Sequence, residues 1–478
     1  MTRKVILTAF LLLLMTASVH AQSENCTACH SDMVSQYLAG PHAGIDCIRC
    51  HQNGEEHTAN PQAAPGVEVQ ADNCGECHQL QFESYMEGEG TDQTRQKQEE
   101  FPLLRRLLAG HPFAEDYREP RSHINMLTDF VQTSRPRSAL CMYCKSSDVY
   151  WQWNDTINYE SNAGELLDNN VIANPITCVQ CHNPHVPELR VVQPALNEAI
   201  ERMPQEHPGR DDPMGSRVCS QCHVNYNFNP AARGIEFPFV KVAQMPDYIN
   251  STEIWRETGT GGWEHPEAGI MLYKVQHPET ELYWDSLHHK LGVSCADCHM
   301  PKRTAENGET YTQHWLTSPL NHIEEGCLNC HSQPPEELRE NVKNIQQDIY
   351  SRMQDAMSVM DVTLDNLATA AETPNVDEDS LSLARQNYFM AHLYWEWIAA
   401  ENSAGFHNPT EARSSLEQAV SFATDAREQS AEAIGAKPSP PAEEVPPARS
   451  FPWVPVLLGL SVVAGILAYF IKYRKIRE

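Results

Sequence analysis

The stretch SALCMYCKSSDV, residues 138–149, holds two cysteines that are two residues apart and are followed by Lys145. The same cysteine spacing occurs at seven other places in the chain, where the next residue is always histidine. C-x-x-C-H is the attachment motif of c-type haem: the two sulfurs bind the vinyl groups and the histidine binds the iron. This stretch is therefore interpreted as a haem site in which lysine replaces the histidine.

The other cysteines follow the same pattern. All sixteen belong to C-x-x-C pairs, and none is left over. In chain order, the eight motifs comprise Cys26, Cys29 and His30; Cys47, Cys50 and His51; Cys74, Cys77 and His78; Cys141, Cys144 and Lys145; Cys178, Cys181 and His182; Cys219, Cys222 and His223; Cys295, Cys298 and His299; and Cys327, Cys330 and His331. Zinc ribbons or disulfides are the alternative, but neither needs the trailing histidine. The sequence therefore predicts eight haem c groups.

Histidine is abundant enough to complete most of these sites. Of 22 histidines, His20 lies in the leading segment and seven lie in the motifs. An iron with histidine on both sides is coordinatively full and passes electrons, whereas an iron that binds a substrate needs an open face. An amine must be neutral and desolvated to bind iron. Lys145 is therefore predicted to mark the reactive haem; the alternative is a relay haem with an amine ligand.

The two ends of the chain differ from its middle. Residues 1–21 have a basic start, an apolar run and a small-residue end, which is typical of a secretory signal peptide. Residues 451–471 contain an apolar run of spanning length, preceded by a Pro-rich linker, 436–450, and followed by a basic tail, 472–478. Because basic tails stay cytoplasmic, we expect a membrane-anchored, single-pass protein on the periplasmic face of the inner membrane.

The haem motifs form two groups along the chain. Three lie in residues 22–115, predicted as an N-terminal three-haem segment, and five lie in residues 116–435, predicted as the catalytic domain. After the last motif, apolar residues recur at three- and four-residue steps, which predicts long helices at 335–373, 378–402 and 409–434. The expected fold class is mainly α: a multihaem cytochrome c with a haem-packed core, little strand, long C-terminal helices and one transmembrane helix.

Charge narrows the range of partners. The formal net charge is −29. Because phosphate binding needs a basic face, nucleic acid is not expected as a partner. A reactive haem that takes an anion needs cationic or hydrogen-bonding groups nearby, and a reduction that consumes protons needs proton donors. Candidates near the motifs, by sequence proximity, are Arg135, Arg137, Tyr226 and His277.

From about residue 101 to 410, the chain resembles the ammonia-forming cytochrome c nitrite reductases. The shared stretches occur in order: LAGHPFAEDYREPRSHINMLTDFVQTSR, CMYCKSSDV, CSQCHVNYNF, KVQHPE, HHKLGVSCADCHMPK, YTQHW and AENSAGFHNPTEA. Three added haem motifs in front resemble the octahaem nitrite reductases, and LAGPHAGIDCIRCH is similar to the front end of hydroxylamine-oxidoreductase-like octahaem cytochromes. The resemblance makes Lys145 the proximal ligand of the catalytic iron. It places Arg135, Tyr226 and His277 around the open face, with Arg137 as a competitor for the role of Arg135.

The resemblance also implies distal iron ligands for four haems. They are His123 for CSQCH, His314 for CVQCH, His407 for CADCH and His288 for CLNCH. For the first three haems, His42 and His57 are candidates from proximity alone. The histidines left unassigned include His111, His185, His207, His265, His322 and His392.

A calcium site beside the active site is also implied, with Asn225, Tyr226, Lys274 and Gln276 in its region. The family usually has glutamate where this chain has Asn225. Because calcium prefers charged oxygen ligands, we expect weaker binding here or no ion at all.

The resemblance implies reduction of nitrite to ammonium with six electrons, and reduction of hydroxylamine on the same path. Two other enzymatic activities remain alternatives: reduction of a sulfur oxyanion such as sulfite or tetrathionate, and hydroxylamine oxidation. Lysine counts against the latter, because that activity goes with an ordinary C-x-x-C-H haem. The non-enzymatic alternative is an electron-transfer conduit. The expected electron donor is a quinol dehydrogenase or a small cytochrome, and the chain is expected to form a homo-oligomer.

Overall fold

The computed structural model describes residues 26–437, except 63–65, 68, 92–94, 120–121, 134–137, 187, 230–232 and 252–261. The predicted signal peptide, transmembrane segment and basic tail therefore lie outside the described residues, as does all but the first two positions of the predicted linker, 436–450. Contacts divide the chain into two units, 1–438 and 439–478, and all the described residues belong to the first.

The described residues are mainly helical, as predicted. Residues 26–39 are helical. The shorter α-helices are α2 (Gly54–Ala59), α3 (Ala71–Gly75), α4 (Gln79–Met86), α5 (Lys97–Glu100), α6 (Leu104–Leu107), α7 (Met126–Gln132), α8 (Val149–Gln152), α9 (Ala163–Asp168), α10 (Pro194–Arg202), α11 (Met214–Ser220), α12 (Met245–Ser251), α14 (Glu279–Tyr283), α15 (Leu287–Lys290), α16 (Cys295–His299) and α17 (Ile323–Gly326). The 3₁₀ turns are η1 (Cys47–Arg49), η2 (Pro112–Ala114), η3 (His123–Asn125), η4 (Ala139–Cys144), η5 (Cys178–Gln180), η6 (Val242–Gln244), η7 (Pro319–Asn321) and η8 (Cys327–Asn329).

Strand is confined to short antiparallel pairs in the described part of the chain. The strands are β1 (Arg95–Gln96) with β2 (Arg118–Glu119), β3 (Asn227–Asn229) with β4 (Gly234–Glu236), β5 (Gly262–His265) with β6 (Ile270–Tyr273), and β7 (Lys302–Thr304) with β8 (Thr310–Thr312). The expectation of little strand is confirmed.

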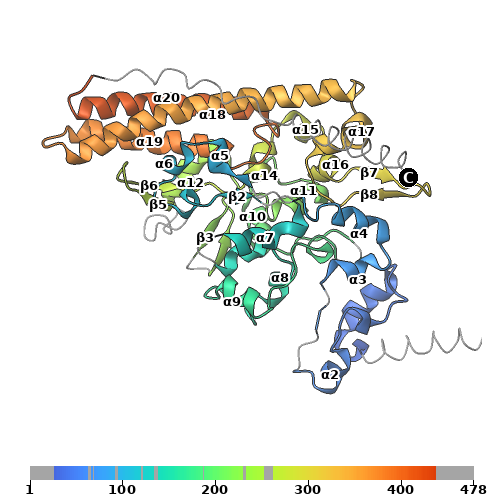
Figure 1. Ribbon diagram of the computed structural model, residues 1–478. Helices are drawn as coiled ribbons and strands as arrows, with labels where there is room; N and C mark the ends of the chain where they lie inside the picture. Colours follow the sequence, from blue (N-terminus) through green and yellow to red (C-terminus); the bar gives the residue numbers. More distant parts are fainter. Residues whose placement is uncertain are drawn as a thin grey trace, which may run out of the picture. The chain divides into compact units, whose positions relative to one another are not determined.

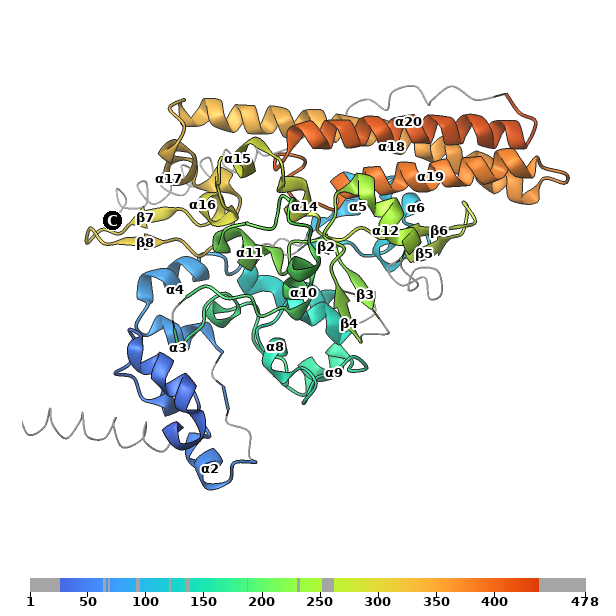
Figure 2. The ribbon, with the colours of Figure 1, turned by 180° about the vertical axis from the view of Figure 1, so that it is seen from behind.

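The three long helices are α18 (Pro335–Glu372), α19 (Glu378–Ala399) and α20 (Pro409–Ala433), close to the predicted ranges. They run alongside one another in both ribbon views (Figures 1 and 2). Proline occupies the first turn of α18 and α20, where its missing N–H costs nothing. The side chains of Asp377 and Asn408 cap the N-termini of α19 and α20. The apolar face of each helix then packs into one shared core.

Most haem motifs are built as a single helical turn. The His51 amide donates to Cys47 O at 2.9 Å, and the His223 amide donates to Cys219 O at the same distance. A turn of this kind brings residues i, i+3 and i+4 to one side of the backbone. The spacing C-x-x-C-H therefore presents two sulfurs and one imidazole on a common face, as attachment to one haem requires.

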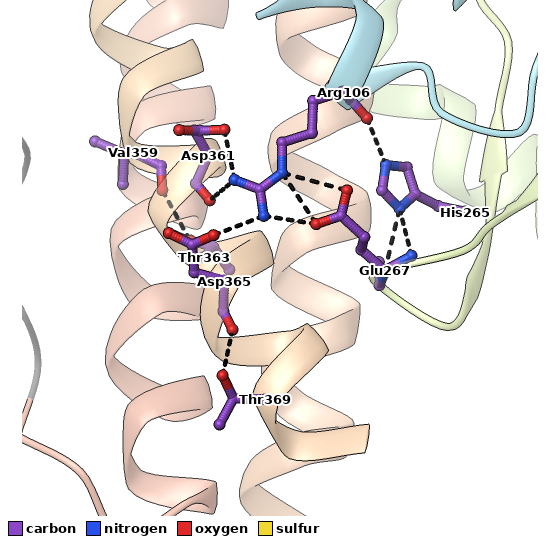
Figure 3. Close-up of polar contacts among 9 residues, drawn as sticks. Arg106, His265, Glu267, Val359, Asp361, Thr363, Asp365 and Thr369 are labelled. Carbon is purple, nitrogen blue, oxygen red and sulfur yellow. Dashed lines mark hydrogen bonds and ion pairs between the residues drawn. The ribbon is translucent and has the colours of Figure 1, made fainter. Parts of the chain in front are cut away.

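Arg106 links helix α6, which precedes the five-haem region, to the long helix α18 through ion pairs (Figure 3). Arg106 in α6 pairs with Glu267 at 2.6 Å, and with Asp361 and Asp365 of α18 at 2.7 Å each. Its carbonyl oxygen accepts a hydrogen bond from His265 Nε2 at 2.8 Å. Only 27% of the Arg106 side chain is exposed, so solvent weakens these ion pairs less than it would on an open surface.

Replacing Arg106 by methionine is expected to lower the free energy of unfolding by about 2 kcal/mol, between the values for exposed and buried pairs. The change leaves three neighbouring carboxylates without their common cation. Thermal unfolding followed by circular dichroism measures the loss. Arg106→Lys, which keeps the charge without the planar fork, should recover only part of it. A methionine variant as stable as the wild type would contradict this role.

The predicted localisation, a single-pass membrane protein, is contradicted. Between residues 26 and 437, outside the gaps given above, no helix combines the length and the apolar composition that membrane crossing requires. The long helices are interrupted by charged residues, as in Arg352, Asp361 and Arg413. The transmembrane helix in the expected fold class is accordingly without support: its segment, 451–471, lies outside the described residues.

Candidate haem sites and active site

Seven motif histidines each face one histidine from elsewhere in the chain. Centroid distances between the rings are 5.9 Å for His30 and His57, 6.0 Å for His51 and His185, 6.1 Å for His78 and His42, 6.4 Å for His182 and His314, 6.4 Å for His223 and His123, 6.3 Å for His299 and His407, and 6.2 Å for His331 and His288. Because metal–imidazole bonds are about 2 Å long, this spacing suits two imidazoles on opposite sides of one iron. The residues present therefore fit haem c.

These pairs can be compared with the ligands expected from sequence. The structure brings together the four pairs implied by the resemblance, and it places His42 opposite His78 and His57 opposite His30. It also places His185, which the sequence analysis left unassigned, opposite His51. The only sequence signal for His185 is its position three residues after His182, inside CHNPH. Nothing in that spacing says that it faces a motif more than 130 residues earlier.

The alternative uses of the cysteines find no support in the described residues. All sixteen cysteines are free of disulfides. Within the part of the chain that the structure describes, no three side chains among histidine, cysteine, aspartate and glutamate gather as a metal ion would need. A zinc ribbon requires four such ligands around one point.

The paired histidines are electrically suited to bind iron. Burial lowers the pKa of His123 to about 4 and that of His299 to about 4, so both rings are neutral near pH 7. The Nδ1 atoms of His42, His299 and His314 donate to the backbone oxygens of Pro184, Thr317 and Thr312 at 2.9, 3.1 and 2.7 Å. This bond fixes the tautomer and leaves Nε2 with a lone pair for a metal.

The Lys145 motif has a rigid base. Its turn, η4, is capped by Ser138, whose hydroxyl accepts from the Leu140 amide at 3.2 Å. Just after Lys145, the buried carboxylate of Asp148 accepts from the amides of Ala173 and Asn174 at 2.7 Å each. The Lys145 side chain is half-buried. The turn is therefore held on both sides by hydrogen bonds that do not involve the lysine.

The remaining described histidines are engaged away from Lys145. The ring nitrogens of His207, His265 and His392 contact the backbone oxygens of Phe239, Arg106 and Leu107. Three more histidines form contacts through their ring nitrogens: His289 pairs with Asp212, His322 contacts Gln313, and His111 accepts a hydrogen bond from the Phe113 amide. His277 lies against Glu279. Among the described residues, seven histidines thus face the seven motif histidines, and six of the others contact groups elsewhere in the fold.

The Lys145 motif and His277 both lie near the CSQCH motif. The thiols of Cys144 and Cys222 are close enough to shift each other's pKa. The next residue, His223, lies 3.9 Å from Glu279, measured from Nδ1 to Oε1, and His277 Nδ1 lies 3.9 Å from the same oxygen. Tyr226 is half-buried beside Phe228. Arg135 and Arg137 lie outside the described residues.

Glu279 was not among the candidates from sequence. It is the first residue of α14 and its side chain is only 7% exposed. Although burial alone would raise the pKa of Glu279, His223 and His277 hold that pKa well below its usual range. The carboxylate is therefore ionised. Its only sequence signal is its place in KVQHPE, two residues after His277.

The residues expected around calcium do not fit that ion. Asn225 is fully buried; its side-chain oxygen accepts from the Gln276 amide at 3.0 Å, and its Nδ2 donates to Tyr273 at 3.1 Å. The side chain of Lys274 pairs with Glu396 at 2.6 Å. Glu281 is close, but burial raises its pKa well above its usual range, which favours the neutral acid. The side-chain oxygen of Asn225, which replaces the glutamate expected as a calcium ligand, is thus neutral and already accepts a hydrogen bond within the protein.

Comparison with known proteins places this chain among multihaem cytochromes. A family model described as cytochrome c552 matches residues 70–451. Cytochrome c-552 of Parabacteroides distasonis is 32% identical over 337 residues, 67% of this chain and 66% of that protein. The cytochrome c nitrite reductase subunit NrfA of Nitratidesulfovibrio vulgaris is 30% identical over 371 residues, 70% of this chain and 69% of that protein. The matches thus span about two thirds of each relative.

A solved structure extends the likeness to the fold. The catalytic subunit of cytochrome c nitrite reductase from Desulfovibrio desulfuricans, described with two calcium sites, has a TM-score of 0.67 and 25% identity. The match covers 77% of this chain and 87% of that one. The resemblance to the nitrite reductase cytochromes is thereby confirmed, and the chain belongs to the cytochrome c552 family.

Proposed function

We propose that this chain reduces nitrite to ammonium, and also hydroxylamine, at a haem whose iron is bound by Lys145. Its relatives include a cytochrome c nitrite reductase, and the similar solved structure is one. The observation that carries the proposal is the pairing of histidines. Seven motif histidines have a histidine partner at 5.9–6.4 Å, and the six other described histidines apart from His277 contact groups elsewhere in the fold. This supports one iron with an open face.

Contacts between motifs support a relay of electrons to that site. In four pairs of cysteines from different motifs, one thiol contributes to the pKa shift of the other, so the two side chains lie near each other: Cys26 and Cys47, Cys74 and Cys178, Cys144 and Cys222, and Cys219 and Cys295. Because each sulfur joins a haem edge, such contacts bring neighbouring edges together. When bound, the haems supply electrons and the iron that takes nitrite. We propose eight haem c groups, with a quinol dehydrogenase or a small cytochrome as donor and a homo-oligomeric assembly.

In this proposal, side chains of the protein bind the iron, hold the substrate and donate protons. Lys145, half-buried above a rigid turn, offers a neutral amine as the proximal ligand. In this proposal, His277 donates protons as N–O bonds break, and Tyr226 assists by hydrogen bonding. Arg135, with Arg137 as its competitor, would hold the anionic oxygens. Calcium has no part in this proposal, because Asn225 is bonded to Gln276.

Titration with nitrite or cyanide tests the open face. We expect one high-spin haem among eight, and its spectrum should shift on ligand binding while the others stay unchanged. Turnover with a reduced viologen as donor should then yield ammonium from nitrite and from hydroxylamine; sulfite, run in parallel, tests the sulfur alternative. Eight low-spin haems and no shift would leave only an electron-transfer conduit.

A further inference from the structure

A single buried carboxylate lies between the active-site histidine and the iron ligand of the neighbouring haem site. Glu279 Oε1 is 3.9 Å from Nδ1 of His277 and 3.9 Å from Nδ1 of His223. Asn402 donates to the same oxygen at 2.5 Å. The other oxygen, Oε2, and Nδ1 of His277 are both buried without a hydrogen-bond partner in the described residues. These unpaired atoms indicate that a small closure would satisfy both groups at once.

The segment that carries this carboxylate is fixed to the CSQCH motif. The Thr280 amide donates to His223 O at 3.2 Å, and the Thr280 hydroxyl is 3.0 Å from that of Ser220. His277 has a φ of 32°, a left-handed conformation that costs a residue with a Cβ free energy. Such strain persists only where the surroundings impose it. Hydrogen bonds of the residue next to Glu279 thus hold this segment beside His223.

This partner differs in kind from those of three other paired histidines. His42, His299 and His314 donate to neutral backbone oxygens. A carboxylate makes an imidazole a more basic ligand, and a more basic ligand favours ferric over ferrous iron. His407, with Glu401 at 3.3 Å, is another paired histidine with a carboxylate beside it. That carboxylate belongs to the residue next to Asn402, which anchors Glu279.

We propose that Glu279 is a positioning residue that sets two properties together: the orientation of His277 toward the open face, and the reduction potential of the haem bound by His223. The role at His277 rests on the proposed function, whereas the role at His223 does not. By facing Nδ1 of His277, the carboxylate leaves Nε2 directed elsewhere. By facing His223, it lowers the potential of the haem beside the reactive one.

Replacing Glu279 by glutamine removes the charge and keeps the shape. We expect the midpoint potential of one low-spin haem to rise in a spectroelectrochemical titration, with altered EPR g-values for that haem only. The value of kcat for nitrite should fall by roughly 10- to 100-fold, with little change in KM. Glu267→Gln removes a more exposed carboxylate that faces Arg106 and no haem ligand; it should change neither readout. Haem content and thermal unfolding check that each variant is folded.

Two further variants keep the inference open to refutation. Asn402→Ala frees the carboxylate without removing it, so the same haem should shift in the same direction by less. If the effect of Glu279 on turnover acts through His277, the double variant His277→Asn, Glu279→Gln should be no slower than His277→Asn alone. Unchanged potentials in Glu279→Gln would overturn the proposal even if the wild type reduces nitrite. A shifted potential in a chain that does not reduce nitrite would uphold the role at His223 and refute only the proposed function.

Discussion

Replacing Lys145 by histidine should leave a protein with all its haems and little nitrite reductase activity. The change makes the eighth motif like the other seven, so covalent attachment through Cys141 and Cys144 is retained. The iron then has an imidazole in place of a primary amine, and an imidazole has a π system that the amine lacks. Exchanging residues that merely support a ligand costs about 10- to 100-fold. Exchanging the ligand itself should lower kcat by at least that much.

Steady-state rates with nitrite and hydroxylamine measure this loss, and the pyridine haemochrome assay checks that eight haems remain. Lys290→His, in the exposed helix α15, is the matched control and should behave as the wild type. Full activity in Lys145→His would show that the amine has no special role at this haem.

Replacing His277 by asparagine should lower kcat by about 10²- to 10⁴-fold, which is the usual contribution of a positioned proton donor. Asparagine can still hydrogen-bond a bound oxygen, but it cannot deliver a proton as the N–O bond breaks. The value of KM should change little, because the cationic groups that attract the anion remain. A large rise in KM with an unchanged kcat would instead make His277 a substrate-binding residue only.

The control for this variant is His207→Asn. His207 is also half-buried, but it contacts Phe239 O and the Trp284 ring, and no motif histidine faces it. Its replacement should leave both kcat and KM near wild-type values. The Lys145 and His277 variants should also differ in spectrum. The first changes the reactive haem's ligand, whereas the second leaves every iron ligand in place.

The parts of this protein that depend on short-range spacing were predictable. A C-x-x-C-H motif lies within one helical turn. Haem attachment, and the replacement of the motif histidine by Lys145, can therefore be predicted without the rest of the fold. The helices α18 and α19 were equally predictable, because an apolar stripe at three- and four-residue steps reports a buried helix face directly. The resemblance added four distal histidines by position in known motifs, and the structure pairs each with its expected partner.

Other features depended on contacts that no local pattern records. His185 faces His51 across more than 130 residues, and Asn402 reaches Glu279 across 123. Asn225 departs from the family by sequence, but only its hydrogen bonds with Gln276 and Tyr273 show what replaces a calcium ligand. The physical reason is the same in each case. Haem attachment and helix formation depend on residues only a few positions apart in the chain. The second ligand of an iron and the partner of a buried charge depend instead on how distant segments pack together.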